Sequence, residues 1–240
     1  EEVKEANQQA FDQSESAATA TALRYLHLPM RVAVGGTMEN TNADGVLQAD
    51  DIITEVDGKK VSEPAEVQDA VRAKKPGDTV DLTVERDGKP RHEKVELGEH
   101  PDAHGREKTP LLGVLMKAVP ADDIDVKYNL QDIGGPSAGM MFSLAVIDKL
   151  SPGELNAGKF VAGTGTIAED GTVGPIGGIQ HKVEAASEAG AELFLAPRDN
   201  CAEALRGKHG DMTIAAVGNI DDAVKAMDDF GRGETPQLCE

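Results

Sequence analysis

Apolar spacing divides the chain into a helical start, a strand-rich middle and an end in which strands and helices alternate. Residues 3–26 contain neither Gly nor Pro, and they predict one long helix that ends before Pro29. In the middle stretch Val80, Leu82 and Val84 alternate with polar residues, which is the spacing of a half-buried strand. The pattern predicts an α+β protein with an N-terminal helix, a β-rich module and a mixed α/β domain.

The β-rich module spans about residues 30–99. Asp57-Gly58 and Asp87-Gly88 predict tight turns between strands, because such pairs adopt the left-handed backbone that hairpin turns need. A helix is predicted over 62–75, with Ser62 as its N-terminal cap. The polar residues 98–110 read as a linker to the next domain.

Beyond the linker, strands and helices alternate. Strands are predicted at 111–119, 159–163, 172–176, 192–196 and 213–217, and helices at 137–150, 179–189, 199–207 and 220–230. We therefore expect an N-terminal helix over 1–28, a β module over 29–100 and a mixed α/β domain over 101–240.

The composition narrows the range of partners. The formal charge of −19 over 240 residues argues against nucleic acid, because few basic groups are available to neutralise phosphates. No apolar run approaches the roughly 18 residues of a membrane-spanning helix. The chain begins without Met, so we expect it to be part of a longer protein, in which any anchor would lie upstream.

The two cysteines, Cys201 and Cys239, lack the close spacing of metal ligands. They fit either one disulfide in an oxidising compartment or two unpaired thiols, and the sequence leaves both open. We predict no metal site and no cofactor.

Ser137 is the first candidate for chemistry. It lies within Gly135-Pro136-Ser137-Ala138-Gly139, which satisfies G-x-S-x-G, directly before an apolar run. The serine could be a helix cap or a nucleophile. At the start of a buried helix, free amides also favour the negative charge that develops in acyl transfer.

A nucleophilic serine needs a base, and two types are available. His181 and His209 follow Ser137, as an α/β-hydrolase-like esterase requires, but no HGGG loop precedes it. Lys182 is the alternative: it is the one charged residue on an apolar stripe with Ile179 and Val183. Burial there would lower the lysine pKa, although snorkelling to the surface remains open.

Two stretches together resemble the proteolytic domain of Lon peptidases from 111 to about 230. They are "DIGGPSAGMMFSLAVIDKL" and "GKFVAGTGTIAEDGTVGPIGGIQHKVEAASEAGAELFLAP". The resemblance implies that Ser137 is the nucleophile and Lys182 its base, with Thr164 hydrogen-bonded to the lysine. Gly135 and Ala138 would support the nucleophile turn. Lon enzymes carry an acidic residue where Gly134 stands here.

The β module resembles a PDZ domain, through "GVLQADDIITEVDGKKV", the helix that follows and the "GDTVDLTVERDG" hairpin. PDZ domains accept a peptide by strand addition beside the helix. The carboxylate-holding loop would precede the first strand, near "LHLPM", where no glycine-rich loop stands. A purely structural module is the alternative.

These resemblances imply a PDZ-containing, Lon-like serine endopeptidase of bacterial type that acts on peptides or unfolded proteins. The string "GELNAGKF" (153–160) ends in Phe160, where a nucleotide-binding loop needs Ser or Thr, so we expect ATP-independent activity. The resemblance further implies a membrane anchor, an extracytoplasmic location and a homo-oligomer. The alternatives are an esterase that uses Ser137 with a histidine, and an inactive PDZ binding protein.

Overall fold

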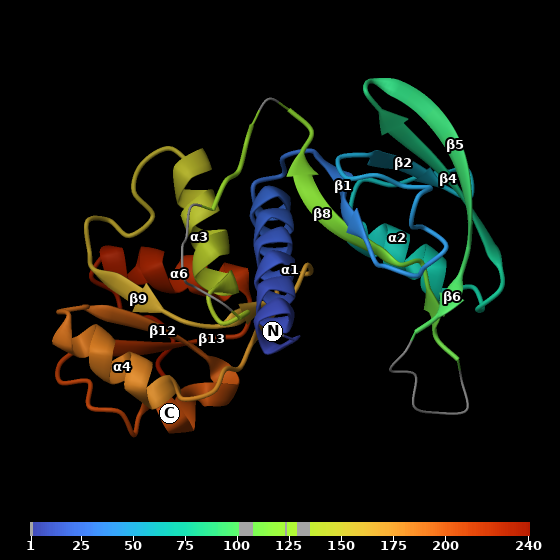
Figure 1. Cartoon of the computed structure of the whole chain (residues 1–240). Coiled ribbons are helices and arrows are strands. Elements are labelled where there is room, and N and C mark those ends of the chain that lie inside the picture. Colours follow the sequence, from blue (N-terminus) through green and yellow to red (C-terminus); the bar gives the residue numbers. More distant parts are fainter. Residues whose placement is uncertain (1, 101–107, 123, 129–134) are drawn as a thin grey trace. The chain divides into compact units, whose positions relative to one another are not determined.

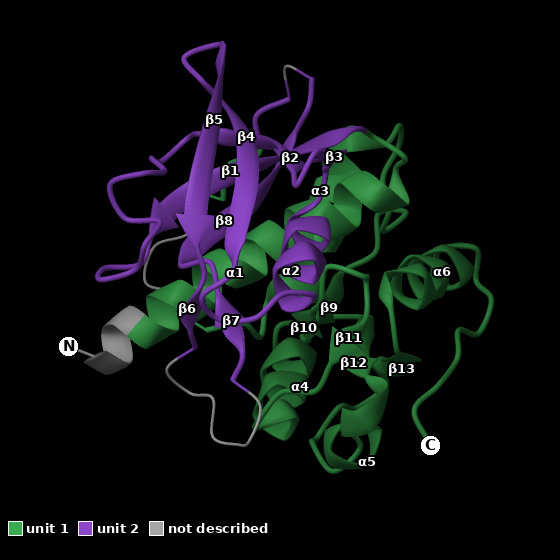
Figure 2. Cartoon of the chain, turned by 90° about the vertical axis from the view of Figure 1, so that its right-hand side faces the viewer, with its two compact units in different colours: residues 1–28, 126–240 green, residues 29–125 purple. Residues whose placement is uncertain are grey.

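The computed structural model describes residues 2–100, 108–122, 124–128 and 135–240 (Figure 1). The chain forms two compact units, Glu1–Leu28 with Val126–Glu240 (unit 1) and Pro29–Asp125 (unit 2) (Figure 2). The chain forms an N-terminal helix, an antiparallel sheet module and a mixed α/β region, so the expected α+β class is confirmed.

Within its described residues, unit 2 has an antiparallel sheet and one helix, α2 (Pro64–Arg72). The strands follow the order β5-β4-β2-β1-β8, and β3 pairs with β2. Their bounds are β1 Met30–Thr37, β2 Ile52–Val56, β3 Lys59–Lys60, β4 Thr79–Arg86, β5 Lys89–Glu96 and β8 Val114–Pro120, with a separate short pair of β6 Gly98–Glu99 and β7 Pro110–Leu111.

Local sequence explains most of unit 2. Asp57 and Asp87 have φ of 49° and 53°, as expected for the two tight turns. Val80, Leu82 and Val84 are buried together with the apolar face of α2. The expected helix cap is wrong, because Glu63 is the cap residue. The Glu66 carboxylate instead accepts from the Ser62 and Glu63 amides at 2.6 and 3.0 Å.

One strand lies in a different domain from the one expected. Residues 111–119 were predicted to open the second domain, but β8 pairs antiparallel with β1, from Met30↔Pro120 to Thr37↔Val114. Apolar spacing identifies a strand but not its partner, because pairing depends on residues far away in the chain. Unit 2 therefore extends past residue 100.

Unit 1 combines a three-stranded parallel sheet, in the order β13-β12-β9, with helices. Its strands are β9 Val161–Gly163, β12 Leu193–Pro197 and β13 Thr213–Val217, with a separate pair, β10 Thr166–Ile167 and β11 Val173–Gly174. Its helices are α1 Glu2–Tyr25, α3 Gly139–Leu150, α4 Ile179–Glu188, α5 Cys201–Ala204 and α6 Ile220–Gly231, with a 3-10 turn at Arg198–Asn200.

Both faces of this sheet are covered (Figure 1). Leu193 and Leu195 face a core shared with α1, α3 and α6. Phe194 and Ala196 face a second core, shared with α4 and α5. Successive residues of a strand point to opposite faces, so the continuous apolar run of β12 is what a doubly covered parallel strand requires.

The first helix belongs to unit 1. The sequence predicts residues 1–28 as a separate segment, but α1 packs against α3, and Ala17, Ala18 and Ala22 join the core on that side of the sheet. The Thr21 hydroxyl donates to the Ala168 carbonyl at 3.0 Å. Unit 1 is thus assembled from two parts of the chain that flank unit 2 in the sequence.

The C-terminal tail is tied to unit 1 by a disulfide between Cys201 and Cys239. Next to it, the Ala216 amide donates to Gln237 and the Cys239 amide donates to Ile214, so the tail runs beside β13. Within the described residues, no helix is both long and apolar enough to cross a membrane. The same residues hold no cluster of three or more His, Cys, Asp or Glu suited to a metal ion.

Candidate active site

Ser137 lies in a turn just before α3, and it does not cap that helix. The helix begins at Gly139, its cap residue is Ala138, and no side chain caps it. The turn is closed by the Gly139 amide, which donates to the Pro136 carbonyl at 3.3 Å. Gly135 has φ of +81°, a left-handed conformation that favours glycine. The serine hydroxyl is therefore available for another partner.

The backbone of Ser137 is held in place from the segment that follows β9. Its carbonyl oxygen accepts from the Thr164 hydroxyl at 2.9 Å and from the Gly165 amide at 2.9 Å. The Gly165 carbonyl in turn accepts from the Met140 amide at 3.1 Å. These three bonds join the nucleophile turn, the segment after β9 and the first turn of α3.

Lys182 approaches Ser137 from α4. The helix starts after Gly178, whose φ of +67° makes a sharp entry that favours glycine. Lys182 Nζ donates to Ser137 Oγ at 2.9 Å and to Thr164 Oγ1 at 3.2 Å. Three side chains that are far apart in the sequence thus form one hydrogen-bonded cluster.

Desolvation by burial lowers the pKa of Lys182 below its ordinary value. The position of Lys182 in the first turn of α4 acts in the same direction, because a helix N-terminus disfavours a cation. No acidic side chain is paired with this lysine in the described parts of the chain. The environment therefore favours the neutral amine.

The expected burial of Lys182 on the apolar stripe is wrong in one respect. Ile179 and Val183 are fully buried, whereas Lys182 is exposed as a residue and only its nitrogen lies against the two hydroxyls. A helix turns about 100° per residue, so a residue three positions from Ile179 lies at the edge of the buried stripe. The amine is therefore close to solvent and close to Ser137.

The histidines are placed differently. His181 is exposed on α4, and His209 lies in the loop after α5. Among the described residues, Ser137 Oγ has a hydrogen bond with Lys182 and none with either histidine. The esterase alternative thus lacks the contact on which it depends.

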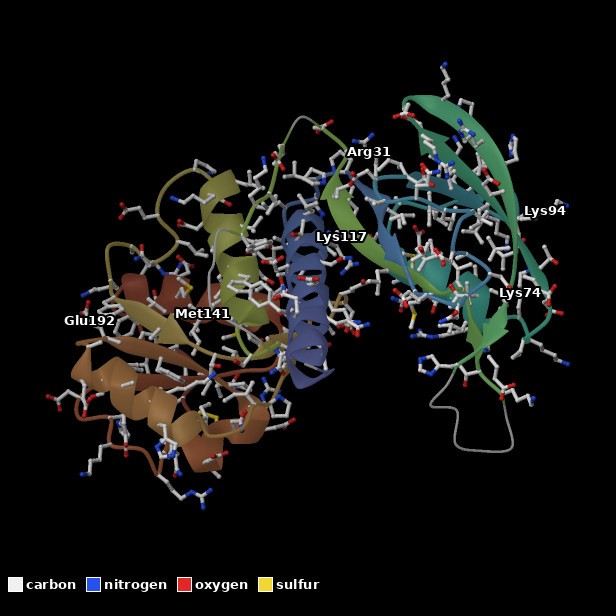
Figure 3. All side chains as sticks on the ribbon, viewed as in Figure 1. Arg31, Lys74, Lys94, Lys117, Met141 and Glu192 are labelled. Carbon is white, nitrogen blue, oxygen red and sulfur yellow. A yellow bond between two sulfur atoms is a disulfide. The ribbon has the colours of Figure 1, made fainter. Side chains whose placement is uncertain are left out.

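Sequence reasoning missed Gly165, whose amide holds the Ser137 carbonyl. A Cβ at this position would come within 2.9 Å of Val173 Cγ1, so the close packing requires glycine. Gly163 is equally tight, because a Cβ there would lie 2.8 Å from Met141 Sδ; Figure 3 labels Met141 on α3. The visible signal was the repeated glycine of "AGTGT", but spacing alone did not indicate its partner.

Comparison with known proteins assigns each unit to a known type. Residues 25–97 match the PDZ domain, and residues 130–227 match the Lon protease (S16) C-terminal proteolytic domain. The chain carries a PDZ domain and a Lon-type proteolytic domain. Residues 2–24 of α1 lie outside both matched ranges, and so do strands β6 to β8.

Individual relatives match parts of the chain. A Lon protease of Campylobacter concisus is 38% identical over 95 residues, which are 38% of this chain and 12% of that protein. A Lon protease of Roseiflexus castenholzii is 46% identical over 66 residues, 28% of this chain and 8% of that protein. The chain thus spans a small part of the curated relatives that it matches. The crystal structure of the PDZ domain of an SdrC-like protein from Listeria innocua is 34% identical, covering 36% of this chain and 92% of that chain with a TM-score of 0.32.

The PDZ domain has a candidate peptide site at β8. This strand ends the sheet order, contacts α2 and, among the described residues, pairs on one side only, with β1. Leu115 on β8 is an exposed apolar side chain. An edge strand beside a helix is the arrangement to which a peptide adds as a further strand.

The edge strand changes the position expected for the carboxylate loop. The sequence predicts this loop before the first strand, near 26–30, but the edge strand beside α2 is β8, and the residues before it are Leu111, Leu112 and Gly113. Gly113 has φ of +77°, and its carbonyl accepts from the Met38 amide at 2.9 Å, which fixes the turn into β8. The glycine expected of such a loop is therefore present at residue 113.

Proposed function

We propose that the chain is an ATP-independent serine endopeptidase that uses Ser137 as nucleophile and Lys182 as general base. The observation that carries the proposal is the 2.9 Å contact between Lys182 Nζ and Ser137 Oγ, within the Lon-type proteolytic domain. A base must lie within about 2.6–3.2 Å of the proton donor that it serves, and this pair meets that condition.

In the first half of the reaction, neutral Lys182 accepts the proton of the Ser137 hydroxyl while Oγ attacks the carbonyl carbon of a peptide bond. The negative charge moves to the carbonyl oxygen. The Ser137 and Ala138 amides, at the start of α3, are its candidate donors, since neither has a recorded acceptor within the described segments. The protonated lysine then gives its proton to the departing amine, and an acyl-enzyme remains.

In the second half of the reaction, water is the attacking group and Ser137 is the leaving group. Lys182, neutral again, takes a proton from water, and the resulting hydroxide attacks the acyl carbon. The lysine returns the proton to Ser137 as the ester breaks, and the carboxylic acid product leaves. Thr164 keeps the amine directed at the serine, because its hydroxyl accepts from Lys182 while donating to the Ser137 carbonyl.

ATP independence is part of the proposal. Residues 153–160, the nearest approach to a nucleotide-binding loop, connect α3 to β9 through turns, and no helix follows them to hold phosphates. Phe160 at the end of the string is exposed and cannot ligate magnesium. Peptides or unfolded proteins are the substrates that a domain without an unfolding motor can take.

For the PDZ domain we propose peptide binding along β8. A peptide C-terminus would have its carboxylate at the Leu112 and Gly113 amides and its side chains beside α2. The free edge of β8, within the described residues, favours this role over that of a purely structural module.

An extracytoplasmic location remains our proposal as well. It is supported by the Cys201–Cys239 disulfide, since such bonds persist mainly in oxidising compartments. Mass spectrometry of protein that has been alkylated at once on cell lysis tests it: unmodified cysteines are expected, and full alkylation of both would contradict it.

The peptidase is tested on an unfolded casein-type substrate with and without ATP, together with labelling by a serine-reactive phosphonate. Ser137→Ala and Lys182→Ala should each abolish turnover, while ATP should change nothing. Matched controls are Lys149→Ala, which removes an exposed lysine of the same unit, and Ser187→Ala on α4; both should retain wild-type rates. Turnover by Lys182→Ala at the wild-type rate contradicts the dyad, and loss with His181→Ala or His209→Ala supports the esterase.

A further inference from the structure

One face of α1 lies against the nucleophile turn and the first turn of α3. Asn7, Phe11 and Ser14 follow the i, i+4, i+7 spacing that places residues on one side of a helix. The Phe11 ring packs edge-on against Phe142 with ring centroids 5.7 Å apart. This part of α1 lies outside both matched domain ranges.

Two polar contacts join this face to the turn itself. The Gly135 amide donates to the Asn7 carbonyl, and the Ser14 hydroxyl donates to the Pro136 carbonyl, both at 3.4 Å. Both bonds are long, so neither is strong by itself. However, Ser14 is only 5% exposed, and a Cβ on Gly139 would lie 2.7 Å from its Oγ. The turn is therefore in close contact with this side chain.

The position of Ser14 has a direct consequence for the nucleophile. The Pro136 carbonyl and the Ser137 N–H belong to the same planar peptide unit and point in opposite directions. The carbonyl is held by two donors, the Ser14 hydroxyl and the Gly139 amide. Holding the oxygen on the α1 side turns the Ser137 N–H away from α1, and this N–H is a donor proposed for the oxyanion.

We propose that α1 is a working part of the peptidase site and that Ser14 is a positioning residue, which fixes the orientation of the Pro136–Ser137 peptide. The inference rests on the proposed peptidase function. The inference adds α1 to the site, a helix that is separated from the other site residues in the sequence by the whole PDZ domain. Ser14 acts through the turn and does not touch the substrate.

The test compares Ser14→Ala with Thr21→Val. Both variants remove one buried hydroxyl of α1 that donates to a backbone carbonyl of unit 1, but Thr21 contacts Ala168, outside the turn. Turnover is measured per active site, counted by phosphonate titration, so that unfolded molecules do not contribute. Ser14→Ala should lower kcat about three- to tenfold with KM unchanged, the usual effect of losing one positioning hydrogen bond. Thr21→Val should keep kcat at the wild-type value.

A second measurement does not depend on activity. Hydrogen exchange of the Gly139 amide, which donates to the Pro136 carbonyl, should become faster in Ser14→Ala and stay unchanged in Thr21→Val. If wild type neither cleaves nor labels, the peptidase proposal fails, and this exchange still decides whether Ser14 holds the turn. Unchanged exchange and unchanged kcat in Ser14→Ala, or equal losses of kcat in both variants, would overturn the inference.

Discussion

The Ala121 amide donates a 2.9 Å hydrogen bond to the Pro29 carbonyl, so the two ends of the PDZ domain meet. The strands next to them, β1 and β8, pair at Met30 and Pro120. The PDZ domain is therefore an insertion between α1 and the rest of the proteolytic unit, with adjacent entry and exit points. Adjacent ends allow a domain to be inserted while its host keeps its fold.

Excising the PDZ domain should leave a folded proteolytic unit. Joining Leu28 to Val126 by a Gly/Ser linker of about six residues should preserve phosphonate labelling of Ser137, since the core of that unit needs α1 but no strand of the PDZ sheet. A matched chain that starts at Val126 lacks α1 and should aggregate. Equal solubility and labelling of the two chains would show that α1 is dispensable.

Peptidase activity should rise with pH through the pKa of Lys182. Only the neutral amine accepts the serine proton, and burial lowers this pKa, so the midpoint of the rise should lie below the ordinary lysine value of 10.5. The measurement is kcat/KM from pH 5 to 10, with His181→Ala and His209→Ala as controls that should follow the same curve. A rise centred near 6.5 that disappears in one of these variants would identify a histidine base instead.

Thr164→Val should lower kcat about tenfold or more, because it removes both the donor to the Ser137 carbonyl and the acceptor for Lys182. Thr164 is 3% exposed, and valine has nearly the same shape as threonine. We therefore expect kcat to fall while the melting temperature changes little. Thr164→Ser keeps the hydroxyl and should retain most of the activity. The two variants are compared by kcat per titrated site and by melting temperature; equal kcat values would refute a role for the hydroxyl.

The disulfide should stabilise the folded proteolytic unit and have little effect on its kcat. It closes a sequence separation of 38 residues, for which chain entropy gives a stabilisation of about 3–4 kcal/mol. Replacing Cys201 and Cys239 together by Ala should lower the melting temperature by several degrees and leave kcat at 25 °C unchanged. Thermal unfolding of the double variant, with wild type before and after reduction, provides the comparison.

A fall in kcat of the double cysteine variant would show a role for the disulfide in the active site. Both cysteines pack in one core cluster with Ile179 and Val183, the residues that seat α4. If kcat at 25 °C falls while the protein remains folded, the bond holds the helix that carries Lys182 in its working position.

The sequence by itself determined the local features of this protein. Turns at Asp57-Gly58 and Asp87-Gly88, the start of α4 at Ile179 and the strand β12 depend on neighbouring residues, and each formed as predicted. The two domain types were also readable, because their motifs are continuous stretches of chain. Ser137 and Lys182 stood out through their flanking glycines and apolar neighbours.

Only the tertiary structure decided which distant segments meet. Apolar spacing cannot distinguish whether β8 pairs with β1 or opens a new domain, since both outcomes bury the same face. Ser14 in α1 carries no local signal, and the repeated glycine around Gly165 does not indicate a partner, because the contribution of both residues is a contact with the nucleophile turn. Lys182 reaches Ser137 because α4 packs on the parallel sheet, so the proximity of the amine to the hydroxyl is a property of the folded core.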